Sequence, residues 1–243
     1  SKLVPHVKDT AKILYGIYLT ITVLEIILLR IFGMPLFDAF TLSFGTVGTG
    51  GFGILNSSIG NYAPVLQNII TVFTILSGVN YSVYFLIISH KVKDAFKIEE
   101  VRWYFFLILS SATLIILNTK HLYSSIGETA RHAFFQVGSI ITTTGYSTTD
   151  FDLWPSFSKT ILVLLMFVGA CAGSTGGGMK VSRFIILFKT IKKELSIIFH
   201  PRLVKKIRMD GHVIEHETVR NTNVFLAMYF SILLLSTLLI SVD

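Results

Sequence analysis

Charged residues, cysteine and proline are scarce in this sequence. Only 14% of the 243 residues are charged, whereas 52% are hydrophobic. A soluble domain typically carries about 25% charged residues, so a soluble globule of this size would lack polar surface. The single cysteine, Cys171, excludes a disulfide framework, and its place in an apolar segment predicts a packed free thiol. With five prolines, the composition also disfavours a disordered chain.

Long stretches contain no charge at all, namely residues 39–90, 103–119, 160–179 and 221–242. A spanning helix needs about 20 mostly apolar residues, so each of the last three stretches predicts one crossing. The first is 52 residues long and includes the Gly-rich residues 46–53. Irregular backbone at membrane depth must be buried in protein or line water. This stretch therefore predicts a short re-entrant helix, a loop and then a spanning helix.

The basic residues are unevenly distributed between the two sides of the predicted spans. Seventeen lie in the N-terminal segment, around residues 91–102 and in residues 180–220, and four lie on the other side. The positive-inside rule predicts a multi-pass protein of the cytoplasmic (inner) membrane, with its N-terminus and basic loops in the cytoplasm. The Gly/Thr-rich loops then open outward. A nucleic-acid partner is disfavoured because predicted membrane-spanning helices flank the basic residues 180–220.

An internal repeat divides the chain. Residues 37–40 (FDAF) lead to residues 46–51 (TVGTGG), and residues 132–135 (HAFF) lead to residues 141–146 (ITTTGY), at an expected offset of 95 residues. In both copies a proline precedes a glycine by 14 residues, Pro64 before Gly78 and Pro155 before Gly169. Each copy thus predicts a span, a short pore helix, a Thr/Gly loop and a second span interrupted by glycine.

The expected fold is an all-α polytopic membrane protein built from such units. We expect one pore unit at residues 1–92, a second with a broken inner helix at 93–200, a cytoplasmic hairpin at 201–218, and the first span of a further, truncated unit at 219–243. The expected elements are spans at 10–31, 62–90, 101–119 and 219–241, a broken span at 157–198, pore helices at 36–46 and 126–141, and loops at 47–60 and 142–154.

The two Thr/Gly loops have the composition of a cation filter. A cation that crosses a membrane exchanges its hydration oxygens for others, which rings of backbone carbonyls can supply. Glycine allows the backbone angles this requires, and threonine adds a hydroxyl. Neither loop core carries an acid, which favours a monovalent over a hard divalent ion. The alternative is a surface turn, which two related copies make less attractive. The candidate ion-binding residues are Thr46, Val47, Gly48, Thr49, Gly50, Gly51, Thr142, Thr143, Thr144, Gly145 and Tyr146.

A second Gly-rich segment interrupts the apolar residues 160–198. Glycine costs about 1 kcal/mol relative to alanine at a helical site, so the helix should break there, below the second loop. The break predicts either a movable gate or a simple kink flanked by snorkelling basic side chains, and we favour the gate. Its candidate residues are Gly169, Gly173, Ser174, Thr175, Gly176, Gly177, Gly178 and Lys180.

Three motifs together resemble the Trk/Ktr/HKT superfamily of potassium transporters, and specifically its bacterial Trk-type membrane subunits. They are residues 37–52, residues 142–146 (TTTGY) and residues 169–180 (GACAGSTGGGMK). Members of the superfamily place four pore units around one pore, and this chain resembles the second and third units plus the first helix of the fourth. The resemblance implies that Gly50 and Gly145 are filter glycines that favour potassium over sodium. It also implies that residues 169–178 obstruct the pore and move on gating.

The resemblance further implies potassium uptake, either passive or coupled as a symport, by a non-enzymatic protein without cofactors other than the transported ion. It also implies three partners: the lipid bilayer, a second copy of the chain in a homodimer, and a cytoplasmic nucleotide-binding regulatory subunit. We expect the sequence to be a segment of a longer protein. Because two units cannot enclose a four-sided pore, the segment alone is expected not to conduct.

Other patterns point to different functions. His212, Glu215 and His216 match the H-x-x-E-H pattern of zinc proteases, so a membrane-embedded zinc hydrolase is one alternative. However, Asp210-Gly211 is a hairpin signal, whereas the zinc pattern requires a helix. A structural subunit without transport is another alternative. Glu25 lies inside the first expected span, where a structural partner and an ion-path role are both open.

Overall fold

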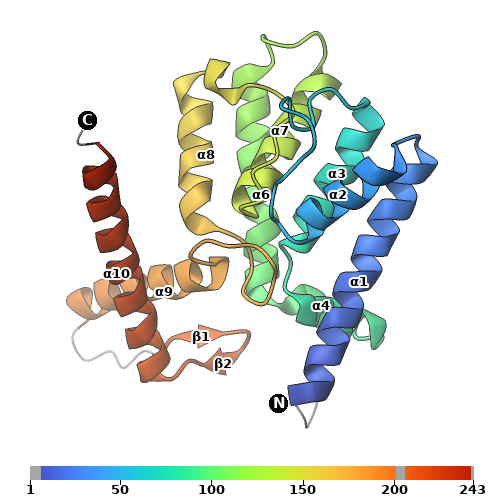
Figure 1. Ribbon diagram of the computed structural model, residues 1–243. Helices are drawn as coiled ribbons and strands as arrows, with labels where there is room; N and C mark the ends of the chain where they lie inside the picture. The colour runs from blue at the N-terminus through green and yellow to red at the C-terminus, as the bar shows by residue number, and fades with distance from the viewer. Residues whose placement is uncertain (1–6, 201–205, 242–243) are drawn as a thin grey trace. The chain divides into compact units, whose positions relative to one another are not determined.

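The computed structural model describes residues 7–200 and 206–241. The chain forms two compact units, Ser1–Lys180 and Val181–Asp243. Figure 1 shows the chain with labels on most of its helices and on both strands. The first unit contains helices α1 (Val7–Ile31), α2 (Leu36–Val47), α3 (Pro64–Ser77), α4 (Tyr81–Ile88), α5 (Val92–Lys97), α6 (Glu99–Thr119), α7 (Ile126–Ile141) and α8 (Ser156–Val168), with a 3-10 turn at Phe151–Leu153. The second contains α9 (Val181–Phe199), β1 (Arg208–Met209), β2 (His212–Val213) and α10 (His216–Ile240).

Three described helices are long and apolar enough to cross a membrane: α1 from Ala11, α6 and α10. The polytopic all-α class expected from the sequence is confirmed. The second expected span, at residues 62–90, is interrupted at Gly78 as the repeat predicts, and α3 and α4 meet there at an angle of 94°. Asn80 explains the bend, since its side chain accepts the Ser82 N–H at 2.8 Å and so starts a new helix.

The two short helices each lie inside a frame of longer ones. In the first repeat α2 packs against α1 and α3, and in the second α7 packs against α6 and α8. Helix α7 also packs against α3 of the first repeat, an arrangement visible in Figure 1. Ser125 caps α7 by accepting the Glu128 N–H at 3.2 Å. The C-terminal ends of α2 and α7 lead directly into the two Thr/Gly loops.

A buried apolar cluster holds the first repeat to the second. Its members come from α1, α2, α3 and α7 and from the loop segments between them: Leu29, Met34, Ala39, Leu42, Ile59, Leu66, Ile70, Phe135 and Tyr146. Between helices in a membrane, such side chains stabilise the contact by close van der Waals packing. This cluster therefore fixes the position of α2 and of the loop that follows it.

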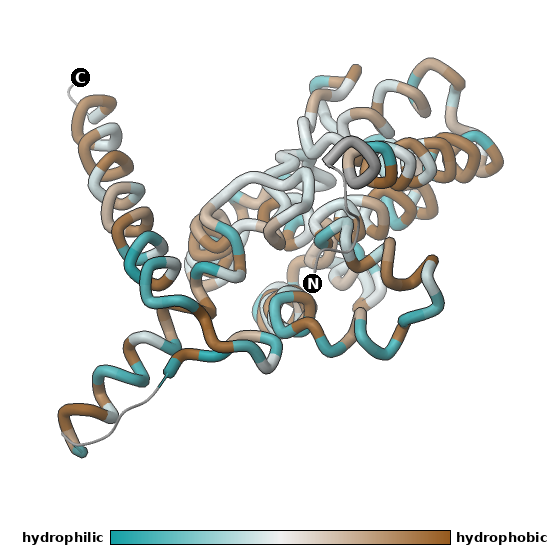
Figure 2. Tube along the Cα trace, turned by 90° about the horizontal axis from the view of Figure 1, so that it is seen from below, coloured by the Kyte–Doolittle hydropathy of each residue, from teal (hydrophilic) through white to brown (hydrophobic). Residues whose placement is uncertain are grey.

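The second unit contains a short hairpin followed by a long apolar helix. Strands β1 and β2 pair antiparallel, with Met209 opposite His212, and Asp210 and Gly211 both have positive φ, 51° and 80°, as a two-residue hairpin turn requires. Arg183 on α9 lies 4.0 Å from the ring centroid of Phe225 on α10. Figure 2 shows hydrophilic residues at the start of α10 and mainly hydrophobic residues towards its C-terminal end.

Candidate functional site

The two Thr/Gly loops have the same backbone hydrogen-bond pattern. In the first loop the N–H groups of Gly50 and Gly51 both donate to the carbonyl of Gly45, at 2.8 and 3.2 Å. In the second loop the N–H groups of Thr144 and Gly145 both donate to the carbonyl of Ser139, at 2.9 and 3.4 Å. Each short helix thus ends in the same tight turn, in which two successive N–H groups share one carbonyl acceptor, although the two loop sequences differ at most positions.

The backbone φ angles also match between equivalent positions of the two loops. Thr49 and Thr143 have φ of 50° and 59°, and Gly51 and Gly145 have φ of 69° and 90°. The equivalent of Gly145 is therefore Gly51 and not Gly50, whose equivalent is Thr144. The predicted offset of 95 residues, and with it the pairing of Gly50 with Gly145, is wrong at these loops, where the offset is 94. The Gly50-Gly51 doublet permits either alignment in the sequence, and only the backbone resolves it.

The two loops contact each other directly. A Cβ placed on Gly51 would overlap the carbonyl oxygen of Thr144, so glycine is required at this approach. The Tyr146 hydroxyl donates to the Phe52 carbonyl at 2.9 Å. Next to it, the Ile59 N–H donates to the Ser147 carbonyl at 2.9 Å. Loops 94 residues apart in sequence therefore form one structure.

The predicted threonines divide into buried and accessible groups. Thr46, Thr49, Thr142 and Thr144 are buried, and the hydroxyls of Thr142 and Thr144 lie 2.7 Å apart. Thr143, together with Gly48, Gly50 and Gly145, is exposed. The hydroxyls of Thr46, Thr142 and Thr144 bond within the short helices and the second loop, whereas the exposed positions leave backbone accessible.

The Gly-rich segment between α8 and α9 is an irregular loop, as the sequence predicts. Gly169, Gly173 and Gly178 have φ of 73°, 73° and 78°, and Lys180 has φ of 76°. A Cβ on Gly169 would lie 2.8 Å from the Cα of Gly178, so the two ends of the segment approach backbone to backbone. The Lys180 ammonium donates to the Gly176 carbonyl within the same loop. Cys171 is buried, as expected.

This segment is hydrogen-bonded to both Thr/Gly loops. The Thr175 hydroxyl donates to the Val47 carbonyl at 2.8 Å and lies 3.2 Å from the Ser77 carbonyl. The Thr49 hydroxyl donates to the Thr175 carbonyl at 3.0 Å. The Gly177 N–H donates to the Thr143 hydroxyl at 2.7 Å. The structure thus brings together three segments that the sequence analysis selected separately.

Further bonds attach the segment to the α3–α4 break and to α6. The Cys171 N–H donates to the Gly78 carbonyl at 3.0 Å, and the Tyr81 N–H donates to the Gly173 carbonyl at 3.0 Å. The Glu100 carboxylate, 4% exposed at the start of α6, accepts the Ala172 N–H at 2.7 Å. Glu100 is not among the site residues predicted from the sequence. An acid in the first turn of a helix is favourable on its own, so the sequence offered no signal for this longer-range role.

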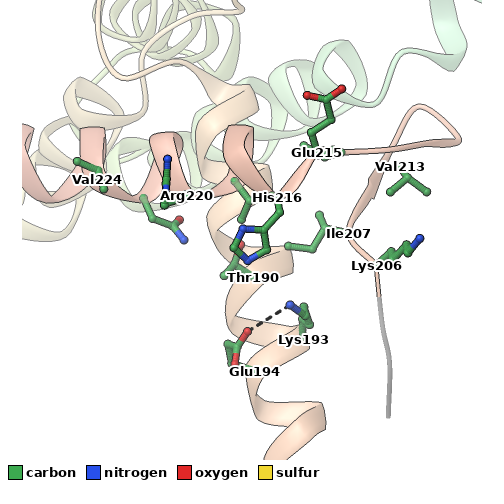
Figure 3. Close-up of a pocket in the computed structure, with 13 residues that line it drawn as sticks. Thr190, Lys193, Glu194, Lys206, Ile207, Val213, Glu215, His216, Arg220 and Val224 are labelled. Atoms are coloured by element: carbon green, nitrogen blue, oxygen red, sulfur yellow. Dashed lines mark ion pairs between the residues drawn. The ribbon is translucent and has the colours of Figure 1, made fainter.

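The residues of the H-x-x-E-H pattern do not form one helix. His212 lies in β2, Glu215 precedes α10 and His216 begins it. Glu215 and His216 line a hollow of about 620 Å³ in the second unit, and Figure 3 shows their side chains pointing in different directions. Within the described part of the chain, no group of three His, Cys, Asp or Glu residues is placed to hold a metal ion. The geometry that the zinc alternative required is not present.

These features define a class of protein: a helical membrane protein with repeated re-entrant helices that end in contacting Thr/Gly loops. The cation transport protein family TrkH matches residues 1–242, and the chain belongs to this family. It is 34% identical to the Trk system potassium uptake protein TrkH of Salmonella typhimurium over 99% of this chain and 50% of that protein. It is 39% identical to the protein of the same name from Halomonas elongata over 86% of this chain and 44% of that protein.

A solved structure agrees with this assignment. The crystal structure of the potassium transporter TrkH from Vibrio parahaemolyticus superimposes with a TM-score of 0.91 at 32% sequence identity, covering 99% of this chain and 53% of that one. The chain spans about half the length of the curated relatives it matches. The names of these relatives describe transport of an ion, in agreement with the expectation of a non-enzymatic protein.

Proposed function

We propose that this chain supplies two pore units of a potassium uptake protein of the cytoplasmic membrane. The observation that carries the proposal is that both Thr/Gly loops form the same tight turn and contact each other. Their residues, 46–51 and 142–146, would provide backbone and hydroxyl oxygens in place of the hydration shell of the ion. The names of the relatives, potassium uptake proteins, support the same ion.

The chemistry of the loops favours a monovalent cation. None of the eleven candidate filter residues is acidic, whereas hard divalent cations usually take carboxylate ligands. Helices α2 and α7 end at the loops, and the C-terminal end of a helix carries about half a negative charge. Both effects would stabilise a potassium ion without binding it too tightly to leave.

The Gly-rich segment would act as the gate below the filter. It is hydrogen-bonded to Thr49, Thr143 and Val47, so an ion that leaves the loops on this side would meet it. Each bond contributes about 0.5–1.5 kcal/mol, which is strong enough to hold a closed form and weak enough to release. The glycines at positive φ would allow the segment to move.

The cytoplasmic partners follow from the charge distribution and the family. The basic residues 180–220 would face the cytoplasm, where they could contact a nucleotide-binding regulatory subunit, and two copies of the membrane subunit would form a homodimer. The Thr/Gly loops would face outward. Transport would be either passive or coupled to another ion.

Complementation tests the proposal. The intact protein, expressed in a bacterial strain without its own potassium uptake systems, is expected to restore growth at low external potassium and to take up rubidium. A non-transporting structural subunit would restore neither. Correctly inserted protein without rubidium uptake would contradict the proposed function.

Thr175→Val is expected to raise basal rubidium uptake about fivefold. The change keeps the shape of the side chain but removes the hydroxyl donor shared by the Val47 and Ser77 carbonyls, which contributes about 1 kcal/mol to the closed form. The matched control is Thr160→Val on the exposed side of α8, whose hydroxyl bonds only within its own helix. Unchanged or reduced uptake with normal insertion would contradict a gate at this segment.

The zinc alternative predicts a different result from replacing two histidines. The variant with both His212→Ala and His216→Ala is expected to retain wild-type rubidium uptake, because neither residue belongs to the loops or to the Gly-rich segment. Uptake should also be insensitive to a zinc chelator. A joint loss of uptake and of bound zinc would restore the metal-site hypothesis.

A further inference from the structure

Glu25 is a buried acid that the transport mechanism does not use. It is the only acidic residue in the apolar span Ala11–Ile31 of α1, and its side chain is 0% exposed. Across residues 7–200 and 206–241, neither carboxylate oxygen has a hydrogen-bond partner. The nearby Arg30 is occupied elsewhere, because its guanidinium donates to the Met34 carbonyl at 3.0 Å.

Burial determines the form of this side chain. A carboxylate removed from water without a cation or a donor beside it is strongly disfavoured relative to the neutral acid. A neutral carboxyl group has one O–H donor, and this donor needs an acceptor. The question is therefore which neighbour of Glu25 can accept a proton.

Thr46 is the polar neighbour that fits. Thr46 lies on α2, which packs against α1, and its buried side chain is near the Glu25 carboxyl, although no hydrogen bond joins the two side chains in the structure. The Thr46 hydroxyl already donates to the Leu42 carbonyl at 2.8 Å, which leaves its oxygen free to accept. The Thr46 carbonyl accepts the Thr49 N–H at 3.1 Å, so Thr46 belongs to the turn that gives Thr49 its positive φ.

The two loops differ in the support that their own side chains provide. In the second loop the Ser139 hydroxyl donates to the Tyr146 carbonyl at 2.6 Å, and the hydroxyls of Thr142 and Thr144 bond to each other. In the first loop the equivalent positions are Gly45, Gly48 and Gly50, which have no side-chain hydroxyls. The first loop lacks these three hydroxyls, and it has Thr46 where the second has Ile140.

We propose that Glu25, in its neutral form, is a positioning residue that supports the first Thr/Gly loop from behind by pairing its carboxyl proton with the Thr46 hydroxyl. The inference rests on the proposed function of that loop as part of the filter. Glu25 acts through Thr46 and does not contact the ion. Glu25 on α1 thus gives the first loop the support that the second loop obtains from its own hydroxyl groups.

The test compares Glu25→Gln and Glu25→Leu in the intact protein, with Thr20→Val on the exposed side of α1 as the matched control. Thr20 bonds only to the Gly16 carbonyl of its own helix. The readout is the ratio of the potassium and sodium concentrations that half-inhibit rubidium uptake. Glu25→Gln and Thr20→Val are expected to keep this ratio within twofold, because the glutamine amide donates as the neutral acid does. Glu25→Leu is expected to lower potassium preference at least fivefold.

Thr46→Val provides an independent test, because it removes the hydroxyl acceptor and leaves Glu25 in place. It should lower the preference as Glu25→Leu does, and the double variant should be no worse than either single one. If Glu25→Gln loses preference as Glu25→Leu does, the charge matters and the proposal is wrong. Unchanged preference in Thr46→Val, or in a correctly inserted Glu25→Leu, also overturns it. A wild-type protein without potassium preference would instead contradict the proposed function.

Discussion

Replacing Gly51 by alanine is expected to abolish potassium-selective uptake, whereas replacing its neighbour Gly50 should leave selectivity almost unchanged. Gly51 has φ of 69°, a conformation that costs an ordinary residue about 1–2 kcal/mol. A Cβ there would also overlap the Thr144 carbonyl oxygen of the other loop. Alanine at position 51 must therefore separate the two loops or unwind the turn.

Gly50 provides the matched control one residue away. A Cβ on Gly50 would meet only the Phe52 ring at 3.6 Å, an ordinary contact, and the equivalent position in the second loop is already a threonine, Thr144. The measurement is rubidium uptake in competition with potassium and sodium. We expect a loss of preference of at least tenfold for Gly51→Ala and less than twofold for Gly50→Ala.

Gly145→Ala is expected to have an intermediate effect. It has φ of 90° but no atom within 4 Å of an added Cβ, so only the backbone strain remains. A reversed order, with Gly50→Ala more harmful than Gly51→Ala, would support the alignment at an offset of 95 and contradict the one seen in the backbone.

Glu100→Ala is expected to raise basal rubidium uptake by about tenfold or more without changing ion preference. The carboxylate accepts the Ala172 N–H at 2.7 Å, and a hydrogen bond to a charged group contributes about 1.5–3 kcal/mol. Loss of this bond leaves the Ala172 N–H without its acceptor and weakens the attachment of the Gly-rich segment to α6. The closed form should therefore be less populated.

Two further variants make this test specific. Glu100→Gln keeps an acceptor oxygen without the charge and should raise uptake by less. Asp94→Asn, which removes only an exposed pair with Lys97, should change nothing. Reduced or unchanged uptake in a correctly inserted Glu100→Ala protein would show that this bond does not hold a gate closed.

The sequence predicted elements best where one strong pattern was sufficient. The short helix expected at residues 126–141 coincides with α7 (Ile126–Ile141), because the internal repeat placed it directly before the Thr/Gly loop. The interruption predicted at Gly78 within the expected span at 62–90 is confirmed, but the sequence did not indicate the size of the bend, 94° between α3 and α4. Hydropathy does not change there, and the bend depends on the Asn80 side chain as the start of a new helix.

The candidate site was harder to predict where it depends on contacts between distant segments. The Gly50-Gly51 doublet permitted two alignments, and only the carbonyl of Gly45 and the positive φ of Gly51 distinguish them. Glu100 resembled an ordinary acid at a helix start. Glu25 was recognisable as a buried acid, but its proximity to Thr46 arises from the packing of α1 against α2.

The most direct test of the central claim is the position of a bound ion in a crystal of the intact protein grown with rubidium or thallium. We expect anomalous density within about 3 Å of backbone oxygens from both loops, one set from residues 49–51 and the other from residues 143–145. Density at one loop only, or beside acidic side chains away from both loops, would contradict a filter formed by the two loops together.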